Sequence, residues 1–341
     1  MSTSDDRSEA EGRSALSTVG SSLDQAADAI AAAPSLALAC HHTPDGDALG
    51  SMLALHHLAL AHGKQSVASW PEPFPVAPHY EFLPGLDLAT KPADFPPEPD
   101  LMITFDCGSI DRLAELGEPA QRAHQLIVVD HHATNDGYGT INLIDPHAAA
   151  SAVVVRRLLD RLGWELTREA AQCLYAALIC DTGRFQYEST TPAVFTLAEE
   201  LSTFDLPIAS MNRRLFEEHR LAYLRLAGAA LQRAVYDGDR RFVATWVTAA
   251  DLVEYGVGMD ETEGLIDLIR RATEADVSAV LKETPEGTKV SLRAVTEFDV
   301  GQLAIAFGGG GHKTAAGFVS PLPVPELLDA LRQSLPRVGA V

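Results

Sequence analysis

Aspartate and histidine side chains recur in short polar segments, each of which directly follows an apolar run. The segment HHTPDGD (41–47) follows SLALAC, Asp106 follows LMITF, and the segment DHH (130–132) follows LIVV. A further aspartate, Asp181, follows the apolar pattern LYAALIC. Carboxylate and imidazole groups bind divalent metal ions and serve in acid–base chemistry. These segments are therefore candidates for a metal-dependent reaction.

Bound cations would remove a conflict of charge among these segments. Carboxylates that converge on one site, with no lysine or arginine inside the motifs, raise one another's pKa. The candidates are too many for one ion that must keep open positions, whereas two ions about 3.5–4 Å apart, bridged by one aspartate, suit in-line phosphoryl displacement. Such ligands favour Mn²⁺ or Mg²⁺, and Fe²⁺, Co²⁺ and Zn²⁺ stay open.

Each segment has a simpler explanation when it is taken alone. Residues 45–47 could form a turn and a helix cap ahead of ALGSMLAL, and the histidines at 131–132 could mark a polar strand end. His56 and His57 lie inside the helical pattern LALHHLAL, and we expect them to be structural. The four segments together, each at the end of an element, favour one shared site.

The elements that position these residues predict an α/β fold. Short apolar runs at 35–40, 65–70, 101–107 and 125–130 alternate with helical patterns, which indicates a mostly parallel sheet with flanking helices. The carboxyl ends of such strands are where open sheets bind ligands. We expect a mobile tail at 1–20, a catalytic domain at 21–204, a helical linker at 205–234, and a smaller α+β domain at 235–341.

The smaller domain contains a second set of candidate residues. Four glycines precede a histidine in GGGGH (308–312), and such a run permits backbone N–H groups to converge on an anion. A helix beginning in the following KTAAGF would add its dipole. Ser291 and Arg293 alternate on the predicted strand KVSLRAV and so share a face. Arg293 could clamp a phosphate, or it could form a structural salt bridge.

Charge and cysteine content limit the class of partner. The formal charge of −21 includes no basic stripe, so a long nucleic acid is an improbable ligand, and a phosphorylated substrate should be short. The four cysteines show no C-x-x-C spacing, and we expect small buried side chains rather than disulfides or a structural zinc site. With no apolar signal segment and no run of 18 apolar residues, we expect a cytoplasmic protein without membrane contact.

The motifs resemble those of the DHH phosphoesterases that carry a C-terminal DHHA1 domain. HHTPDGDALGS (41–51) is similar to the first motif of that family, Asp106 to the second, DHH (130–132) to the third and DTG (181–183) to the fourth. GGGGH is similar to the DHHA1 signature. The resemblance covers nearly everything after the tail.

The resemblance implies a role for each candidate. His41, Asp45 and Asp106 would hold one metal ion; Asp106 would bridge to a second. Asp106 and His132 would be catalytic, with His132 on the scissile phosphate and Asp130 orienting the histidine pair through a hydrogen bond. The implied ligands of the two ions are His41, Asp45, Asp47, Asp106, His131 and Asp181. The implied substrate contacts are His132, Ser291, Arg293, Gly309, Gly310, Gly311 and His312.

Length and domain content favour the nanoRNase and pAp-phosphatase group of that family. We expect a hydrolase, with Mn²⁺ preferred, that converts short RNAs or dinucleotides such as pApA to mononucleotides, with cyclic-di-AMP as a further candidate substrate. It would also convert pAp to AMP. A homodimer is what the family implies. Two alternatives stay open: an inorganic pyrophosphatase or polyphosphatase, and a sensor that binds a cyclic dinucleotide without turnover.

Overall fold

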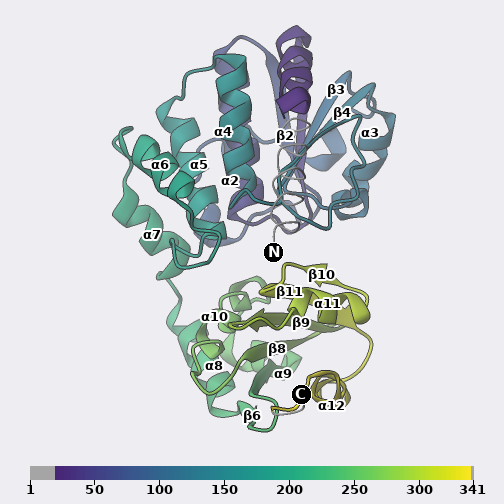
Figure 1. The fold of residues 1–341 in the computed structure, drawn as a ribbon, viewed down its shortest axis with the longest axis vertical. Helices are drawn as coiled ribbons and strands as arrows, with labels where there is room; N and C mark the ends of the chain where they lie inside the picture. The colour runs from purple at the N-terminus through teal and green to yellow at the C-terminus, as the bar shows by residue number, and fades with distance from the viewer. Residues whose placement is uncertain (1–19, 339–341) are drawn as a thin grey trace, which may run out of the picture. The chain divides into compact units, whose positions relative to one another are not determined.

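The computed structural model describes residues 20–338, which form two compact units that meet in sequence between Leu215 and Phe216 (Figure 1). The tail expected at 1–20 lies outside the described residues, apart from residue 20, which belongs to a helix that continues to residue 32. No helix in the range 20–338 combines the length and the apolar character needed to cross a membrane. Each unit is described by itself below.

The first unit is built on a parallel sheet, as the sequence predicts. Its strands run in the order β2-β1-β3-β4-β5, and every neighbouring pair is parallel. The edge strand β5 is an addition that the sequence analysis did not predict. The central strands are buried along almost their whole length, which explains their continuous apolar runs. The strands are β1 (Ser35–Cys40), β2 (Gln65–Ser69), β3 (Leu101–Phe105), β4 (Gln125–Asp130) and β5 (Ile141–Ile144).

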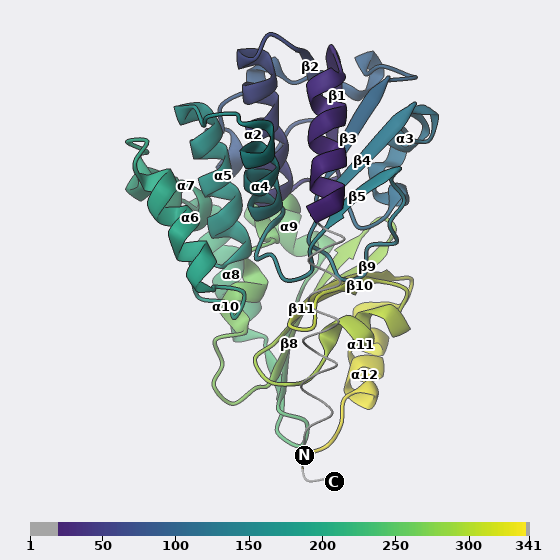
Figure 2. The ribbon, with the colours of Figure 1, turned by 45° about the horizontal axis from the view of Figure 1, so that its top comes forward.

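Helices cover both faces of this sheet (Figure 2). α2 packs on β1 and β3, and α4 packs on β4. On the other face, Leu116 and Ala120 pack with Ala37 and Met102 of the sheet. The helices are α2 (Gly46–Ala61), α3 (Gly117–Arg122), α4 (Ser151–Leu162), α5 (Arg168–Asp181), α6 (Pro192–Ser202) and α7 (Ile208–Phe216), with short 3-10 helices at η1 (Pro78–Tyr80), η2 (Leu86–Leu88), η3 (Pro92–Asp94) and η4 (Ile110–Leu116).

Two glycines let α2 lie directly against α5. A Cβ atom on Gly46 would fall 2.3 Å from the Sγ atom of Cys180, and one on Gly50 would fall 2.4 Å from the carbonyl oxygen of Cys173. Any larger side chain would therefore push the two helices apart. This close approach brings the start of α2 next to the end of α5, where Asp181 stands.

The second unit is a mixed sheet with helices, which confirms the expected smaller α+β fold. The strand order is β10-β11-β9-β8-β7-β6, with β7 and β8 parallel and the other pairs antiparallel. The strands are β6 (Val235–Asp237), β7 (Phe242–Val247), β8 (Val277–Thr284), β9 (Gly287–Ala294), β10 (Gly310–Gly311) and β11 (Ala315–Ser320). The helices are α8 (Leu221–Gln232), α9 (Ala249–Tyr255), α10 (Leu265–Ile269), α11 (Val300–Ala306) and α12 (Val324–Ser334), with a 3-10 turn at η5 (Asp260–Thr262).

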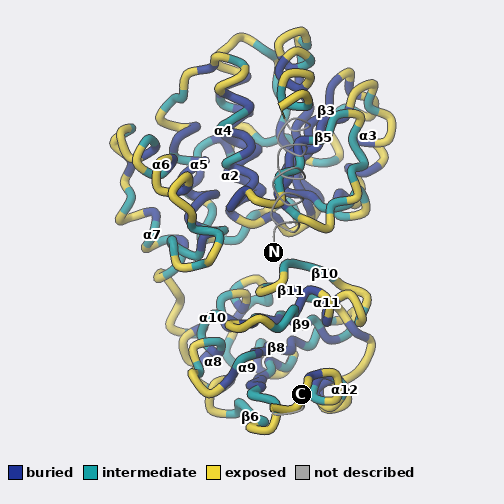
Figure 3. Tube along the Cα trace, viewed as in Figure 1, coloured by how far each residue is buried: buried dark blue, intermediate teal, exposed yellow. Residues whose placement is uncertain are grey.

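Apolar clusters lie on both faces of this second sheet, and buried residues follow the central strands in Figure 3. Leu281 and Leu292 pack with Leu303 of α11 and Leu327 of α12. On the other face, Val243 and Val280 pack with side chains of α8 and α10. α8 thus contributes Tyr223, Leu226, Ala227 and Ala230 to the core of this unit.

Two details of the second unit differ from the sequence prediction. The glycine run is followed by the strand β11, not by a helix, because β10 pairs antiparallel with β11 through a tight turn. Gly308 and Gly311 have φ of +82° and +140°, which a helix does not allow. The run TEGLIDLIRRATEA (262–275) predicts one helix, but the structure forms only α10 within it, because the chain turns back to begin β8 at Val277.

Candidate metal centre

The carboxyl ends of three neighbouring strands carry the predicted ligands of the first unit. His41 follows β1, Asp106 follows β3, and His131 follows β4. These side chains are almost completely buried, with residue exposures of 3%, 2% and 6%. Parallel strands end at the same edge of a sheet, so the fold itself gathers them.

A first group of possible ligands consists of His41, Asp45 and Asp106, whose ligand atoms lie within 4.8 Å of one another. The Nε2 atom of His41 is 3.7 Å from Oδ2 of Asp106 and 3.9 Å from Oδ2 of Asp45. Its Nδ1 atom lies 2.8 Å from the carbonyl oxygen of His42, so Nδ1–H donates there. This hydrogen bond leaves Nε2 as the atom that faces the carboxylates. Asp45 also caps α2, because its side chain accepts from the N–H groups of Asp47 and Ala48.

A second group consists of Asp47, Asp106 and His131, again within 4.8 Å. The Nε2 atom of His131 is 3.4 Å from Oδ1 of Asp106 and 3.8 Å from Oδ2 of Asp47. Asp181, at the end of α5, approaches the same nitrogen to 3.0 Å. The Nδ1 atom of His131 lies 3.2 Å from the carbonyl oxygen of Ala148, which fixes the ring orientation. Asp106 thus belongs to both groups, as the bridging role predicted for it requires.

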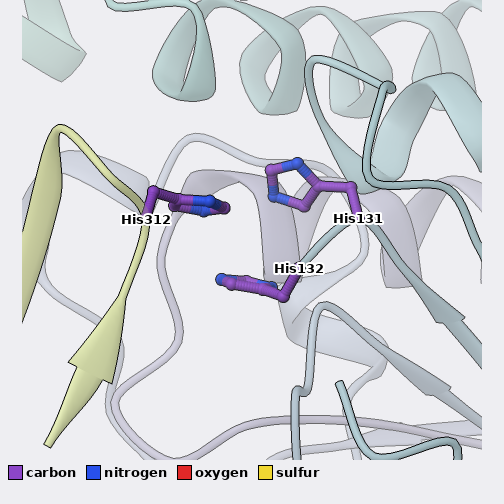
Figure 4. Close-up of side chains that lie close together, drawn as sticks. All are labelled: His131, His132 and His312. Atoms are coloured by element: carbon purple, nitrogen blue, oxygen red, sulfur yellow. The ribbon is translucent and has the colours of Figure 1, made fainter. Parts of the chain in front are cut away.

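Asp130 organises the two histidines that follow it. One of its carboxylate oxygens accepts from the N–H groups of His131 and His132, at 2.8 Å and 3.3 Å, and from Nδ1 of His132 at 2.7 Å. Its other oxygen accepts from Asn135 at 2.5 Å. Figure 4 shows the rings of His131 and His132 side by side, with centroids 4.9 Å apart. Asp130 therefore has the geometry of an orienting residue.

Ser151, at the start of α4, is a residue of this centre that the sequence analysis missed. Its hydroxyl donates to Oδ1 of Asp106 at 3.0 Å, and its N–H donates to Oδ2 of Asp47 at 2.5 Å. The next N–H group, of Ala152, reaches Oδ1 of Asp47 at 3.1 Å. The first turn of α4 thus holds two candidate ligands in place. Only the small residues AAAS ahead of the apolar helix could have signalled this role.

Arg112 is a second residue that the motifs did not reveal. It lies in η4, and its Nη2 atom is 3.1 Å from Nδ1 of His41. Its carbonyl oxygen accepts from the N–H group of His42 at 2.9 Å. Nothing in the spacing of the motifs points to this contact, because it joins positions about seventy residues apart in sequence.

The crowding of carboxylates changes their pKa values. Burial, followed by the charges of Asp106 and Asp181, raises the pKa of Asp47 well above its usual range. Burial also raises the pKa of Asp181, although His131 opposes it. Burial would raise the pKa of Asp106 too, but hydrogen bonds from His131 and His41 outweigh it and lower that pKa. Buried oxygen and nitrogen ligands in mutual repulsion fit divalent cations, which would relieve the conflict.

Three of the four cysteines are buried, as predicted, and Cys180 is half-buried. Cys40 and Cys107 are fully buried, and burial raises the pKa of the Cys107 thiol to about 11. His56 lies in α2 and contacts Ser66 of β2 at 2.9 Å. Burial lowers the pKa of His56 to about 4, so it is neutral at physiological pH.

The second unit brings its own predicted residues together on neighbouring strands. Ser291 and Arg293 lie on β9, opposite Gly317 and Ala315 of β11, and share a face as predicted. Arg293 lies 4.0 Å from Asp267 and donates to the carbonyl oxygen of Leu292. His312 follows β10 directly and donates its N–H to the carbonyl oxygen of Ala315 at 2.7 Å.

The glycine run has a packing reason that requires no ligand. A Cβ atom on Gly309 would fall 2.2 Å from the carbonyl oxygen of Gly317, and one on Gly311 would fall 2.6 Å from that of Ala315. The N–H group of Gly309 donates to the carbonyl oxygen of Ala304. Substrate contacts by Gly309, Gly310 and Gly311 therefore stay a prediction.

Comparison with known families identifies both units. Residues 35–178 match the DHH family, N-terminal domain, and residues 241–337 match the DHHA1 domain. The protein of Thermus thermophilus named bifunctional oligoribonuclease and PAP phosphatase NrnA is 33% identical over 309 residues, which are 89% of this chain and 90% of that protein. The protein of the same name in Bacillus subtilis is 25% identical over 81% of this chain and 86% of its own length.

A solved structure shares the fold. It belongs to an exopolyphosphatase-related protein from Bacteroides fragilis, with a TM-score of 0.85 and 24% identity over 92% of this chain and 95% of that one.

Proposed function

The chain belongs to the DHH family and carries a DHHA1 domain, and from this premise we propose that it is a metal-dependent phosphoesterase that acts on short oligoribonucleotides, dinucleotides and pAp. The names of the relatives from Thermus thermophilus and Bacillus subtilis support this choice of substrates. The observation that carries the proposal is the pair of ligand groups that share Asp106. The products are mononucleotides from short RNA, pApA or cyclic-di-AMP, and AMP from pAp.

Two divalent ions, preferably Mn²⁺, complete the centre in this proposal. His41, Asp45 and Asp106 would hold one ion. Asp47, His131 and Asp181 would hold the second together with Asp106, the residue common to both groups. When bound, the ions supply Lewis acidity at the phosphoryl oxygens and a water nucleophile at neutral pH.

The side chains of the chain position the reacting phosphate. His132 contacts it, held in place by the Nδ1–H hydrogen bond to Asp130 at 2.7 Å. Burial would lower the pKa of His132, but the hydrogen bond to Asp130 and the charge of Asp106 raise it above its usual value. His132 can therefore stabilise negative charge on the phosphate as it develops. Water attacks phosphorus, the bond to the ribose oxygen breaks, and that oxygen takes up a proton.

The division of labour between the domains is part of the same proposal. Residues 21–204 form the catalytic domain and 235–341 the substrate-binding domain. The connection at 205–234 includes α8, which packs in the core of the second unit. The nucleotide is bound by side chains and backbone groups of the second unit: Arg293, Ser291, His312 and residues 309–311. The formal charge of −21 favours short substrates over long nucleic acids. We propose a homodimer, after the family, and a cytoplasmic location, supported by four free cysteines in the described structure.

A competition assay tests the proposed function. The purified chain is supplied with Mn²⁺ and an equimolar mixture of pAp, pApA, cyclic-di-AMP and a trinucleotide, and the products are separated over time. We expect mononucleotide to form from at least one of them, and no product after chelation. Pyrophosphate in a parallel reaction should turn over more slowly than the fastest of the four. Faster phosphate release from pyrophosphate would make the chain a pyrophosphatase, and tight binding of cyclic-di-AMP without turnover would make it a sensor.

A substitution in the second unit tests the substrate contacts. Arg293→Gln removes a guanidinium that can bind phosphate bidentately, so KM should rise roughly tenfold with little change in kcat. Arg332→Gln, on α12, is the matched control, because Arg332 pairs with Asp329 on the same helix at 3.2 Å. An unchanged KM for Arg293→Gln would remove Arg293 from the binding site.

A further inference from the structure

A cavity of about 320 Å³ lies within the second unit, and none of its lining residues is among the metal ligands or substrate contacts of the proposed function. It opens at the end of the sheet where β7 and β8 begin and β9 ends, and the segment after α12 closes it. Three arginines line it: Arg240, Arg241 and Arg337. Among the described residues of its lining, Asp276 supplies the one carboxylate.

The charges in this cavity are only partly balanced. Arg241 pairs with Asp276, with Nε 2.9 Å from Oδ1. Arg240 places one Nη atom 3.1 Å from Asp237, but its Nε–H is buried without a hydrogen-bond partner in the described structure. Within residues 20–338, Arg337 takes part in no ion pair or hydrogen bond. A buried donor of Arg240 and the exposed guanidinium of Arg337, which has no ion pair within residues 20–338, thus line one cavity in a chain whose formal charge is −21.

Apart from Thr296, the rest of the lining is apolar, and part of it belongs to the core of the unit. Val277 and Leu335 are members of the core cluster, and Phe298 packs against it. Pro336 adds a further apolar surface. Ligand pockets span about 300–1,000 Å³ and combine apolar walls with a few polar groups. This cavity stands at the lower end of that range, where a ligand of mononucleotide size fits.

We propose that the cavity binds a nucleoside monophosphate. Its phosphate lies between Arg240 and Arg337, where Nε–H of Arg240 gains its missing acceptor and the dianion balances Arg337. Its nucleoside lies against Phe298 and Pro336. The site is distinct from the metal centre and from the face that carries Ser291 and Arg293. Only the choice of AMP as a probe rests on the proposed function, because AMP is the product of that reaction.

Calorimetric titration of the whole chain in a chelating buffer tests this site. AMP, orthophosphate and adenosine are titrated separately, so that phosphate and nucleoside contributions are separated. AMP should bind more tightly than either of the other two. Equal affinity for orthophosphate and AMP would overturn the nucleoside half of the proposal, and no binding of AMP would overturn all of it.

Substitutions locate the binding. Arg337→Gln and Arg240→Gln should each weaken AMP roughly tenfold or more, because a charge-assisted contact to phosphate is lost. Phe298→Ala should weaken AMP but not orthophosphate. Arg332→Gln, outside the cavity, should change nothing. AMP affinity that survives both arginine substitutions but disappears in Arg293→Gln would place the nucleotide at β9 and refute the cavity site.

The two proposals can fail separately. Asp106→Asn disables the metal centre of the proposed function, yet AMP should bind this variant as tightly as it binds the parent chain. A chain that hydrolyses none of the substrates but binds AMP through Arg240 and Arg337 would refute the proposed function alone. A hydrolase whose AMP binding is insensitive to both arginines would refute the cavity site alone.

Discussion

Two sites of the chain, one in each unit, hold charge in opposite ways. In the first unit, Asp47, Asp106 and Asp181 surround the single imidazole nitrogen of His131 within 3.8 Å. In the second unit, a carboxylate meets one guanidinium: Asp251 accepts from both Nη atoms of Arg233, at 2.6 Å and 2.8 Å. The pKa of Asp47 is raised by burial and like charges, whereas the hydrogen bond from Arg233 lowers the pKa of Asp251 to about 2.

Crowded charge and paired charge serve different purposes. A one-to-one pair is already satisfied and contributes to the stability of the fold. A cluster of like charges opposes folding until a ligand of opposite sign arrives, so its persistence points to function. The backbone supports this distinction, because Thr43 and Asp106 at the crowded edge have φ of +49° and +52°. Non-glycine residues in this region are strained, and such strain concentrates at functional sites.

The largest expected effect follows from breaking the crowded cluster at its shared member. Asp106→Asn keeps the size of the side chain and tolerates the left-handed backbone, but removes the charge shared by both ligand groups. Turnover of pApA with Mn²⁺ should fall by roughly 10³-fold or more. The thermal midpoint in chelator should fall, because hydrogen bonds from His131 and His41 hold the pKa of Asp106 below its usual value and so make its charge favourable in the folded state. Normal turnover would show that Asp106 bridges nothing.

Asp181 provides a test in which the sign of the effect depends on metal. Because burial raises its pKa in the folded state, Asp181 destabilises the metal-free fold at neutral pH. The penalty shrinks as the pH falls below that raised pKa and is gone below the unfolded value near 3.8. Asp181→Asn should therefore leave the midpoint in chelator unchanged or higher. With Mn²⁺ present, calorimetry should show metal affinity reduced by roughly tenfold or more. A lower midpoint in chelator would mean that Asp181 is structural.

Gly46 links the packing of α2 and α5 to this centre. Gly46→Ala places a methyl group against Cys180, the residue before Asp181, and should lower the free energy of unfolding by about 1–3 kcal/mol. Mn²⁺ affinity should fall with it, because Asp181 moves with α5. Gly228→Ala is the matched control in α8, where nothing lies within 4 Å of the added Cβ atom. It should stabilise by about 1 kcal/mol. Unfolding curves of both variants decide whether Gly46 positions the centre.

The sequence predicts the strand ends well and the long-range contacts of other elements poorly. His41, Asp106 and His131 could be placed together because continuous apolar runs identify buried parallel strands, whose carboxyl ends share an edge. Ser151 and Arg112 could not, because each acts across a long separation in sequence and through a geometry that no spacing encodes. The paired role of Gly46 and Cys180 was hidden for the same reason.

The second unit shows a different limit of sequence reasoning. The strands β7, β8 and β9 follow from their apolar and β-branched runs, but the glycine run predicted a helix start where the structure has β10 and β11. Glycine leaves both conformations open, and only the pairing of β10 with β11 decides between them. Arginines at 240, 241 and 337 meet in one cavity through the fold alone.

The smallest effect concerns the paired charge of the second unit. Asp251→Asn removes the partner of Arg233 and one half of the capping box with Thr248. At pH 7 the free energy of unfolding should fall by roughly 1–2 kcal/mol, after allowance for solvent screening of Arg233. Because the folded pKa of Asp251 is depressed to about 2, its contribution is complete above the unfolded value near 3.8 and is lost as the pH falls toward 2. Denaturant unfolding at pH 7 and pH 3 should therefore show a smaller difference between variant and parent at pH 3. This pH dependence is opposite in sign to that of Asp181, whose charge is unfavourable until a cation binds. Equal pH profiles of unfolding free energy for the two sites would therefore remove the distinction between paired and crowded charge.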